Sequence, residues 1–267
     1  MRLFYSFAIF SLLLISCSKD QGGAAAGGNG AGGNSGVKTP EPPFAVTVIG
    51  DSYSTYDGWN NVGNGFNKYY PTTSVPDITD VSQTWWHQLC QTPEFDLEKL
   101  NTYSGSTISY KKGATLFPNM DKRAFCARLT RTDMGSPEVI LIFGGTNDSW
   151  HNTDDDIGSY KYEGWVYEDL QKFRPAFAYM IATLKKNFPN AYIYNITNSG
   201  RNGMSEGGLT AAVADSMAEI CKHYGIMNIV LSSTLDDGGK TSRHPNLKGM
   251  QIIYSQVYAA LKKDLGL

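Results

Sequence analysis

The chain has 267 residues, of which 41% are hydrophobic, 18% charged and 12% aromatic, and its formal charge is −2. This composition is typical of a globular protein with a buried core, and it lacks the basic surplus of a nucleic-acid binder. No uninterrupted apolar run is long enough for a membrane-spanning helix, and four cysteines are too few for a disulfide scaffold.

The N-terminal segment has the pattern of an export signal. Arg2 precedes a mostly apolar stretch over residues 3–15, which ends at Ser16 and Cys17. This junction resembles a bacterial lipobox, in which the chain is cut before the cysteine and the thiol is lipidated. We therefore expect residues 1–16 to be a lipoprotein signal peptide. An ordinary secretory signal that contains a cysteine is the alternative.

A tether is predicted between the lipid and the domain, over residues 17–43. Residues 21–36 contain eight glycines and no large side chain, so they bury too little surface to offset their ordering entropy. The domain itself is predicted over residues 44–267. The expected location is the bacterial cell envelope, where a lipid on Cys17 anchors the protein in the outer membrane. Whether the domain faces the periplasm or the outside stays open.

The remaining cysteines allow two interpretations. If Cys17 carries lipid, then Cys90, Cys126 and Cys221 are left, and at most one disulfide can form among them. Cys90 and Cys126 could pair. The favoured alternative is that all three are small buried apolar side chains.

The first half of the domain predicts three strands and two helices. The apolar, β-branched run over residues 45–49 indicates a buried strand that ends at a glycine. A helix over residues 82–91, a strand over 97–103 and a helix over 121–130 follow. Residues 139–143 (VILIF) have the clearest strand pattern of the chain.

The second half continues the alternation. Apolar residues three and four apart predict a helix over residues 174–187, then a strand over 191–196 and a helical stripe over 209–224. A strand over 226–231 and a terminal helix over 250–261 complete the chain. Strands that are apolar throughout and alternate with helices indicate a parallel sheet covered on both faces. The predicted class is therefore α/β: a three-layer α/β/α sandwich around a doubly wound, five-stranded parallel sheet.

Four polar segments follow the predicted strands. Ser52 comes after the first, Gly105 after the second, Asn147 after the third, and His244 lies between the fifth strand and the last helix. Ligands of such sheets bind outside the carboxyl ends of the strands, so these residues are expected to converge.

These residue types suffice for acyl transfer. A serine hydroxyl becomes a good nucleophile when an imidazole removes its proton, which assigns Ser52 as nucleophile and His244 as base. The oxyanion that forms needs hydrogen-bond donors, and the N–H groups of Ser52 and Gly105 and the side-chain amide of Asn147 are the candidates. A glycine also lets the backbone approach the substrate closely.

Each residue also has a simpler interpretation. Ser52 could cap a helix and Asn147 could form a turn, but convergence of four segments favours the catalytic roles. His151, expected in a loop, is the rival base, whereas His87 and His223 lie in predicted helices. Asp51 and Asp148 are expected to fix loops by hydrogen bonds.

No metal and no cofactor are expected. Three consecutive aspartates at residues 154–156 are interpreted as a solvated loop, because no histidine or glycine-bearing calcium pattern accompanies them.

The segments together resemble the SGNH (GDSL-type) hydrolase family of esterases and lipases. GDSYS matches its first block around Ser52, the Gly105 segment its second, GGTND its third with Asn147, and His244-Pro245 its last. The resemblance covers residues 44–267, in a lipoprotein form. It implies a flavodoxin-like SGNH hydrolase fold and a serine esterase with these residues in the family's roles.

One position departs from the family pattern. The last block usually has an aspartate three residues before the histidine, and here that position is Thr241. We therefore expect a Ser–His dyad whose imidazole is oriented by a backbone carbonyl or by Thr241.

The substrate is expected to be an acylated glycan or another small ester. Two long segments, residues 53–80 and 149–168, are rich in aromatic side chains. For most of them the favoured interpretation is a small core packed beneath the loops. Aromatic faces also suit sugar rings, and Tyr53, Trp150 and His151 are the candidate lining residues. We expect a tethered esterase that hydrolyses O-acyl groups, O-acetyl first, on carbohydrate. The alternatives are a lipase, thioesterase or acyltransferase on the same site, or a catalytically decayed glycan-binding lipoprotein.

Overall fold

A computed structural model describes residues 41–59, 68–110, 123–129, 133–151, 154–198, 208–231 and 244–267. They belong to a compact unit over residues 40–267. The predicted signal peptide, Cys17 and most of the predicted tether lie outside the described residues, as does Thr241. No helix in the described ranges is both long and apolar enough to cross a bilayer.

The sheet has five strands in the order β2-β1-β3-β4-β5, and every pairing is parallel. This confirms the predicted doubly wound sheet. The strand bounds are β1 (Phe44–Gly50), β2 (Phe95–Thr102), β3 (Val139–Phe143), β4 (Tyr192–Thr197) and β5 (Met227–Val230).

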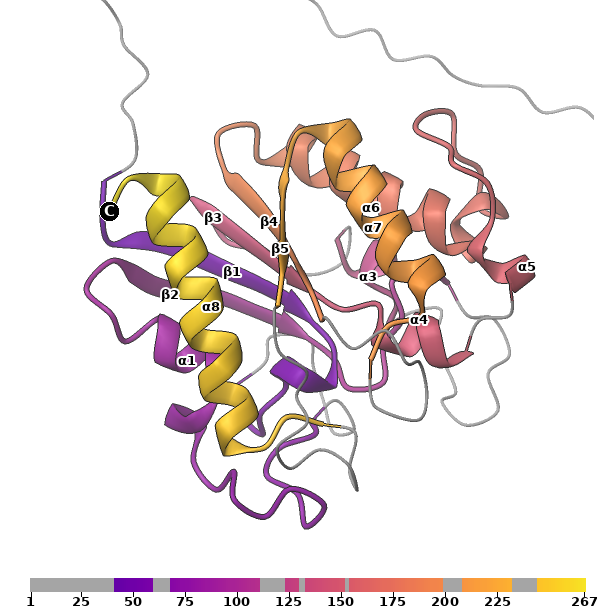
Figure 1. The fold of residues 1–267 in the computed structure, drawn as a ribbon. Coiled ribbons are helices and arrows are strands. Elements are labelled where there is room, and N and C mark those ends of the chain that lie inside the picture. Colours follow the sequence, from indigo (N-terminus) through magenta and orange to yellow (C-terminus); the bar gives the residue numbers. More distant parts are fainter. Residues whose placement is uncertain are drawn as a thin grey trace, which may run out of the picture. The chain divides into compact units, whose positions relative to one another are not determined.

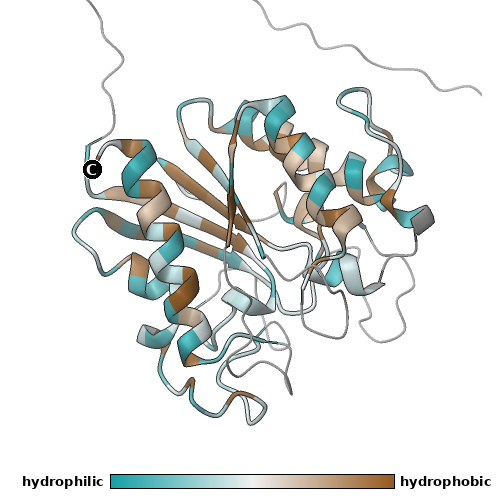
Figure 2. Cartoon of the chain, viewed as in Figure 1, coloured by the Kyte–Doolittle hydropathy of each residue, from teal (hydrophilic) through white to brown (hydrophobic). Residues whose placement is uncertain are grey.

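Helices cover both faces of the sheet (Figure 1). One face carries α1 (Trp85–Leu89) and α8 (Leu247–Leu265), and the other carries α3 (Phe125–Arg128), α6 (Phe173–Asn187) and α7 (Ala211–Tyr224). The strands are hydrophobic along most of their length, whereas the helices mix polar and apolar residues (Figure 2). This is the pattern expected when only one stripe of each helix meets the sheet.

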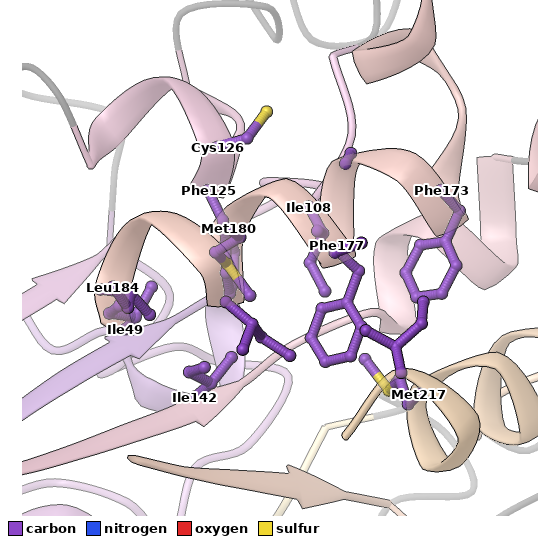
Figure 3. Packing of buried hydrophobic residues seen from close by; sticks show 14 of the residues in the cluster. Ile49, Ile108, Phe125, Cys126, Ile142, Phe173, Phe177, Met180, Leu184 and Met217 are labelled. Atoms are coloured by element: carbon purple, nitrogen blue, oxygen red, sulfur yellow. The ribbon is translucent and has the colours of Figure 1, made fainter. Parts of the chain in front are cut away.

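Successive side chains of a strand enter the two different cores. Val46 and Val48 of β1 pack with α1 and α8, whereas Ile49 packs with α3, α6 and α7. Figure 3 shows this second core, where Ile142 of β3 lies among the side chains of α6, including Phe177. The two cores hold the sheet rigid, which fixes the ends of its strands.

Two short helices were not predicted: α4 (Thr146–His151) and α5 (Asp154–Ile157). The expectation that His151 and residues 154–156 lie in loops is therefore wrong. Helices of four to six residues contain too few turns for an apolar stripe to appear. The predicted helix over residues 82–91 is also divided, into the 3-10 helix η2 (Val81–Gln83) and α1.

Cys90, Cys126 and Cys221 are free and buried. The interpretation without a disulfide is the one that the structure bears out.

Candidate active site

The candidate site lies at the carboxyl ends of β1 and β3, which are neighbours in the sheet. β2 pairs with one side of β1, whereas β3, β4 and β5 follow on the other side, so the strand order reverses direction at β1. Such a reversal of strand order opens a crevice at the sheet edge in doubly wound folds. Ser52 follows β1, and Asn147 follows β3.

Ser52 begins the 3-10 helix η1 (Ser52–Ser54), directly after β1. Asp51 caps this helix, because its Oδ1 accepts a hydrogen bond of 3.1 Å from the N–H of Tyr53. Gly50 is required at the turn, since a Cβ there would lie 2.7 Å from the Ser54 side chain. The tight turn therefore holds Ser52 at the end of the strand.

His244 reaches Ser52 from 192 residues away. Its Nε2 lies 2.8 Å from Ser52 Oγ, and the exposed fractions of the two residues are 9% and 4%. This distance is that of a hydrogen bond between a hydroxyl and an imidazole nitrogen. With Nδ1 protonated, the imidazole can accept the Ser52 proton at Nε2.

Gly105 and Asn147 complete the set of converging residues. Gly105 lies in the turn after β2 with φ of 73°, a conformation that favours glycine. Asn147, in the first turn of α4, donates from Nδ2 to the carbonyl of Ser106 at 2.9 Å and to Asp51 Oδ2 at 3.3 Å. The Asn147 amide therefore connects the segment after β1 with the segment after β2.

The two aspartates fix loops, as expected from the sequence. Asp148 accepts hydrogen bonds from the N–H groups of Ile108 and Ser109 at 2.7 and 3.2 Å and from the Ser109 hydroxyl at 2.8 Å. Burial raises the pKa of Asp51 to about 7; the charge of Asp148 adds to the rise, and the Tyr53 N–H opposes it.

Aromatic rings surround the His244 imidazole. Tyr69 stacks on it, with ring centroids 3.6 Å apart and planes 11° from parallel. Tyr53 and Trp150 meet it edge-on at 5.3 and 6.2 Å. Tyr70 donates from its hydroxyl to the carbonyl of Pro245 at 2.6 Å, which fixes the backbone next to His244.

The candidate lining residues differ in their surroundings. Tyr53 is only 1% exposed and packs edge-on against Phe143, so it belongs to the core and the expectation that it lines the substrate site is wrong. Trp150 is partly exposed beside His244. His151 ends α4, and Thr241 falls outside the described residues. Within the described ranges, no three His, Cys, Asp or Glu side chains form a cluster that could hold a metal ion.

Sequence reasoning did not assign a role to Tyr69 or to Arg128. Tyr69 is one of many aromatic residues in an irregular segment, and Arg128 lies in a predicted helix where an arginine is ordinarily exposed. The one available signal for Arg128 was its position between Phe125 and Leu129, two apolar residues of the same predicted helix.

Comparisons with known proteins identify the family of this chain. The model of the GDSL-like lipase/acylhydrolase family matches residues 44–261. A solved structure from Bacteroides uniformis, assigned as a GDSL-like lipase, is 41% identical, with a TM-score of 0.69 over 82% of this chain and 96% of its own. A second, from Bacteroides ovatus, is 35% identical, with a TM-score of 0.69 over 82% of this chain and 98% of its own.

A more distant structural neighbour is a family two carbohydrate esterase from Clostridium thermocellum in complex with cellohexaose. It is 18% identical, with a TM-score of 0.53 over 86% of this chain and 66% of its own, and the likeness concerns the fold. No curated protein matches the chain in sequence.

Proposed function

Because this chain belongs to the family of GDSL-like lipases and acylhydrolases and is a carboxylic ester hydrolase, we propose that it is a serine esterase for O-acylated carbohydrates. Ser52 is the nucleophile and His244 the general base. The observation that carries this assignment is the 2.8 Å contact between Ser52 Oγ and His244 Nε2. O-acetyl esters are the favoured substrates.

The first half of the reaction forms an acyl-enzyme. Ser52 Oγ attacks the ester carbonyl while its proton passes to His244 Nε2. The carbonyl oxygen becomes an oxyanion in a tetrahedral intermediate. When the intermediate collapses, the bond to the sugar oxygen breaks and His244 returns the proton to that oxygen. The sugar leaves with a free hydroxyl, and the acyl group stays on Ser52.

The second half repeats these steps with water as the nucleophile and Ser52 Oγ as the leaving group. His244 takes a proton from a water molecule, whose oxygen attacks the acyl carbon, and a second tetrahedral intermediate forms. Its collapse breaks the bond to Ser52 Oγ, which recovers the proton from His244. Acetate is released, and the enzyme returns to its starting state.

The oxyanion is stabilised by the N–H groups of Ser52 and Gly105 and by the Asn147 amide. In the free protein both Asn147 donations go to protein acceptors, at 2.9 Å to the Ser106 carbonyl and at 3.3 Å to Asp51. The longer bond is the weaker one, so the oxyanion replaces Asp51 as acceptor while the bond to Ser106 keeps the amide in place.

Support for a carbohydrate substrate comes from aromatic side chains on the carboxyl-end side of the sheet. Tyr69 and Trp150 adjoin His244. Trp59, in the segment that leads from β1 to α1, is 44% exposed and contacts the ring of Trp86. Partly exposed aromatic rings provide flat apolar faces with which sugar rings can stack. The carbohydrate esterase bound to cellohexaose has a related fold.

Attachment to the cell envelope is a second part of the proposal. The apolar stretch before Ser16 and Cys17 and the glycine-rich segment after them support a lipidated tether on the bacterial outer membrane. Expression in a bacterial host tests this: the wild-type protein incorporates radiolabelled palmitate and fractionates with membranes. A Cys17→Ser variant that still incorporates the label would exclude Cys17 as the site.

Acyl-chain selectivity tests the enzymatic part. The purified protein is assayed with p-nitrophenyl acetate, butyrate and octanoate, and then with acetylated xylan by measuring released acetate, each beside Ser52→Ala. The proposal predicts Ser52-dependent turnover that is fastest on acetate, and acetate release from the polymer.

Two other outcomes identify the alternatives. Faster turnover of octanoate than of acetate would favour a lipase or thioesterase. Binding of xylan without any Ser52-dependent turnover would indicate a glycan-binding protein with a decayed site.

A further inference from the structure

The guanidinium of Arg128 is buried directly beneath the candidate site. Arg128 lies in α3, is 1% exposed and stacks over the Phe125 ring at 4.5 Å. Burial of a full charge is costly unless hydrogen bonds replace the lost water. An arginine in this position therefore needs several fixed acceptors.

Those acceptors lie at the carboxyl ends of β1 and β2, in the turn after β2 and just before α3. Arg128 Nη2 donates to the carbonyl of Gly50 at 3.0 Å and to that of Asn101 at 3.3 Å. Its Nη1 donates to the Ser106 hydroxyl at 2.9 Å and to the Arg123 carbonyl at 2.8 Å. One rigid fork thus joins β1, β2 and the turn after β2.

Two of the four acceptors, the Gly50 carbonyl and the Ser106 hydroxyl, lie close in sequence to a proposed oxyanion donor. Gly50 lies two residues before Ser52, and Ser106 follows Gly105 directly. The Ser106 carbonyl is also the acceptor that holds the Asn147 amide at 2.9 Å. The spacing between the donors from the two loops therefore depends on the group that ties these loops together.

We infer that Arg128 is the positioning residue of the oxyanion hole: its guanidinium holds the Ser52 and Gly105 N–H groups and the Asn147 amide in register around one oxygen. This inference rests on the proposed function, because the oxyanion donors are part of that proposal. Arg128 itself touches no reacting atom and acts through Gly50 and Ser106.

The planar fork is the property that matters. A lysine at position 128 keeps the charge but carries all its N–H donors on one nitrogen, which cannot replace the two separate nitrogens that reach the Gly50 carbonyl and the Ser106 hydroxyl. Displacement of an oxyanion donor by about a few tenths of an ångström weakens its hydrogen bond to the oxyanion, and this bond forms only in the transition state. The loss is therefore expected in kcat and not in KM.

The test compares Arg128→Lys with a matched arginine away from the site. Arg174 donates from Nε to Ser216 Oγ and from Nη1 to the Gly158 carbonyl, both at 2.9 Å, and it stacks over Tyr160 at 4.4 Å. Arg128→Lys is expected to lower kcat for p-nitrophenyl acetate about 10- to 100-fold with little change in KM. Arg174→Lys is expected to leave both constants within about twofold.

A second variant covers the case in which Arg128→Lys does not fold. Ser106→Ala removes one acceptor and leaves the guanidinium bound to three carbonyls, so the protein should fold. It is expected to lower kcat about 3- to 10-fold. Affinity for phenylboronic acid, which forms a tetrahedral adduct on an active-site serine, should fall in parallel with kcat in both variants.

The outcomes separate the two proposals. Wild-type turnover that depends on Ser52, together with unchanged kcat in Arg128→Lys or, if that variant does not fold, in Ser106→Ala, would overturn the role of Arg128 and leave the esterase intact. An equal loss of kcat in Arg128→Lys and Arg174→Lys would do the same, since it would indicate general destabilisation. If wild-type protein lacks Ser52-dependent turnover, the proposed function and this inference both fail.

Discussion

The ring of Tyr69 lies flat on the imidazole of His244, with ring centroids 3.6 Å apart and planes inclined by 11°. A proton arriving on His244 therefore places a positive charge over the face of an aromatic ring. Such an arrangement stabilises the imidazolium by about 0.5–1 kcal/mol or more when it is shielded from water. The stack also restricts rotation of the imidazole away from Ser52.

Replacing Tyr69 should slow the chemical step. We expect Tyr69→Leu to lower kcat about 3- to 10-fold, because the imidazolium loses its stacked partner and the ring gains freedom. The rate is measured with p-nitrophenyl acetate. The chain contains its own control, since Tyr162 stacks on His223 with the same centroid distance of 3.6 Å and planes inclined by 10°. Tyr162→Leu should not change kcat, and an equal effect of the two substitutions would contradict a specific role for Tyr69.

The buried carboxyl of Asp51 should make stability depend on pH. Because burial raises its pKa from 3.8 to about 7, the folded protein holds this proton more tightly than the unfolded chain. The contribution of Asp51 is therefore complete below about pH 4 and is lost as pH rises through about 7. The asparagine of the Asp51→Asn variant has no titratable group, so it makes no such pH-dependent contribution.

Urea unfolding at pH 4.5 and pH 8 measures the effect. The difference in unfolding free energy between wild type and Asp51→Asn should change by about 1–3 kcal/mol, with wild type relatively more stable at the lower pH. A difference that stays constant across this range would show that Asp51 has the same pKa in the folded and unfolded chain.

The core between the sheet and α6 should be sensitive to cavities. Phe177 is fully buried among side chains from α3, α6 and α7, so Phe177→Ala is expected to lower the unfolding free energy by about 3–5 kcal/mol. Val166, 56% exposed, provides the control, and Val166→Ala should change it by less than about 0.5 kcal/mol. Equal effects in chemical denaturation would contradict the packing described above.

The three described cysteines should resist alkylation in the folded protein. Burial raises the pKa of Cys90 and Cys221 to about 12 and that of Cys126 further, so little thiolate exists at neutral pH. Peptide mapping after iodoacetamide treatment should show all three unmodified in native protein and all three modified in denaturant without a reductant. A disulfide between any two would leave both unmodified in the denatured sample.

The sequence was sufficient to predict that the polar segments after the strands converge at one edge of the sheet. Ser52 and His244 are 192 positions apart, yet a parallel sheet brings the segments after its strands to one edge, and the two side chains lie 2.8 Å apart. Asn147 and Gly105 could be found for the same reason. β1 and β3 were predictable because their apolar runs are buried on both faces of the sheet.

Contacts that depend on distant backbone were not predictable. Burial of Arg128 requires carbonyls of Gly50 and Asn101, whose positions follow from the packing of β1 against β2. The Tyr69 stack belongs to an irregular segment in which no periodicity distinguishes one aromatic residue from the next. Helix α4 is too short for an apolar stripe, so its residues resembled a loop.

Covalent labelling shows which serine is the nucleophile. The purified protein is treated with diisopropyl fluorophosphate, and hydrolysis of p-nitrophenyl acetate and the labelled peptide are followed together, with Ser52→Ala alongside. We expect one adduct, on Ser52, whose formation matches the loss of hydrolysis, and no adduct in the variant. Full hydrolysis by Ser52→Ala, or inactivation with the adduct on a different serine, would contradict it.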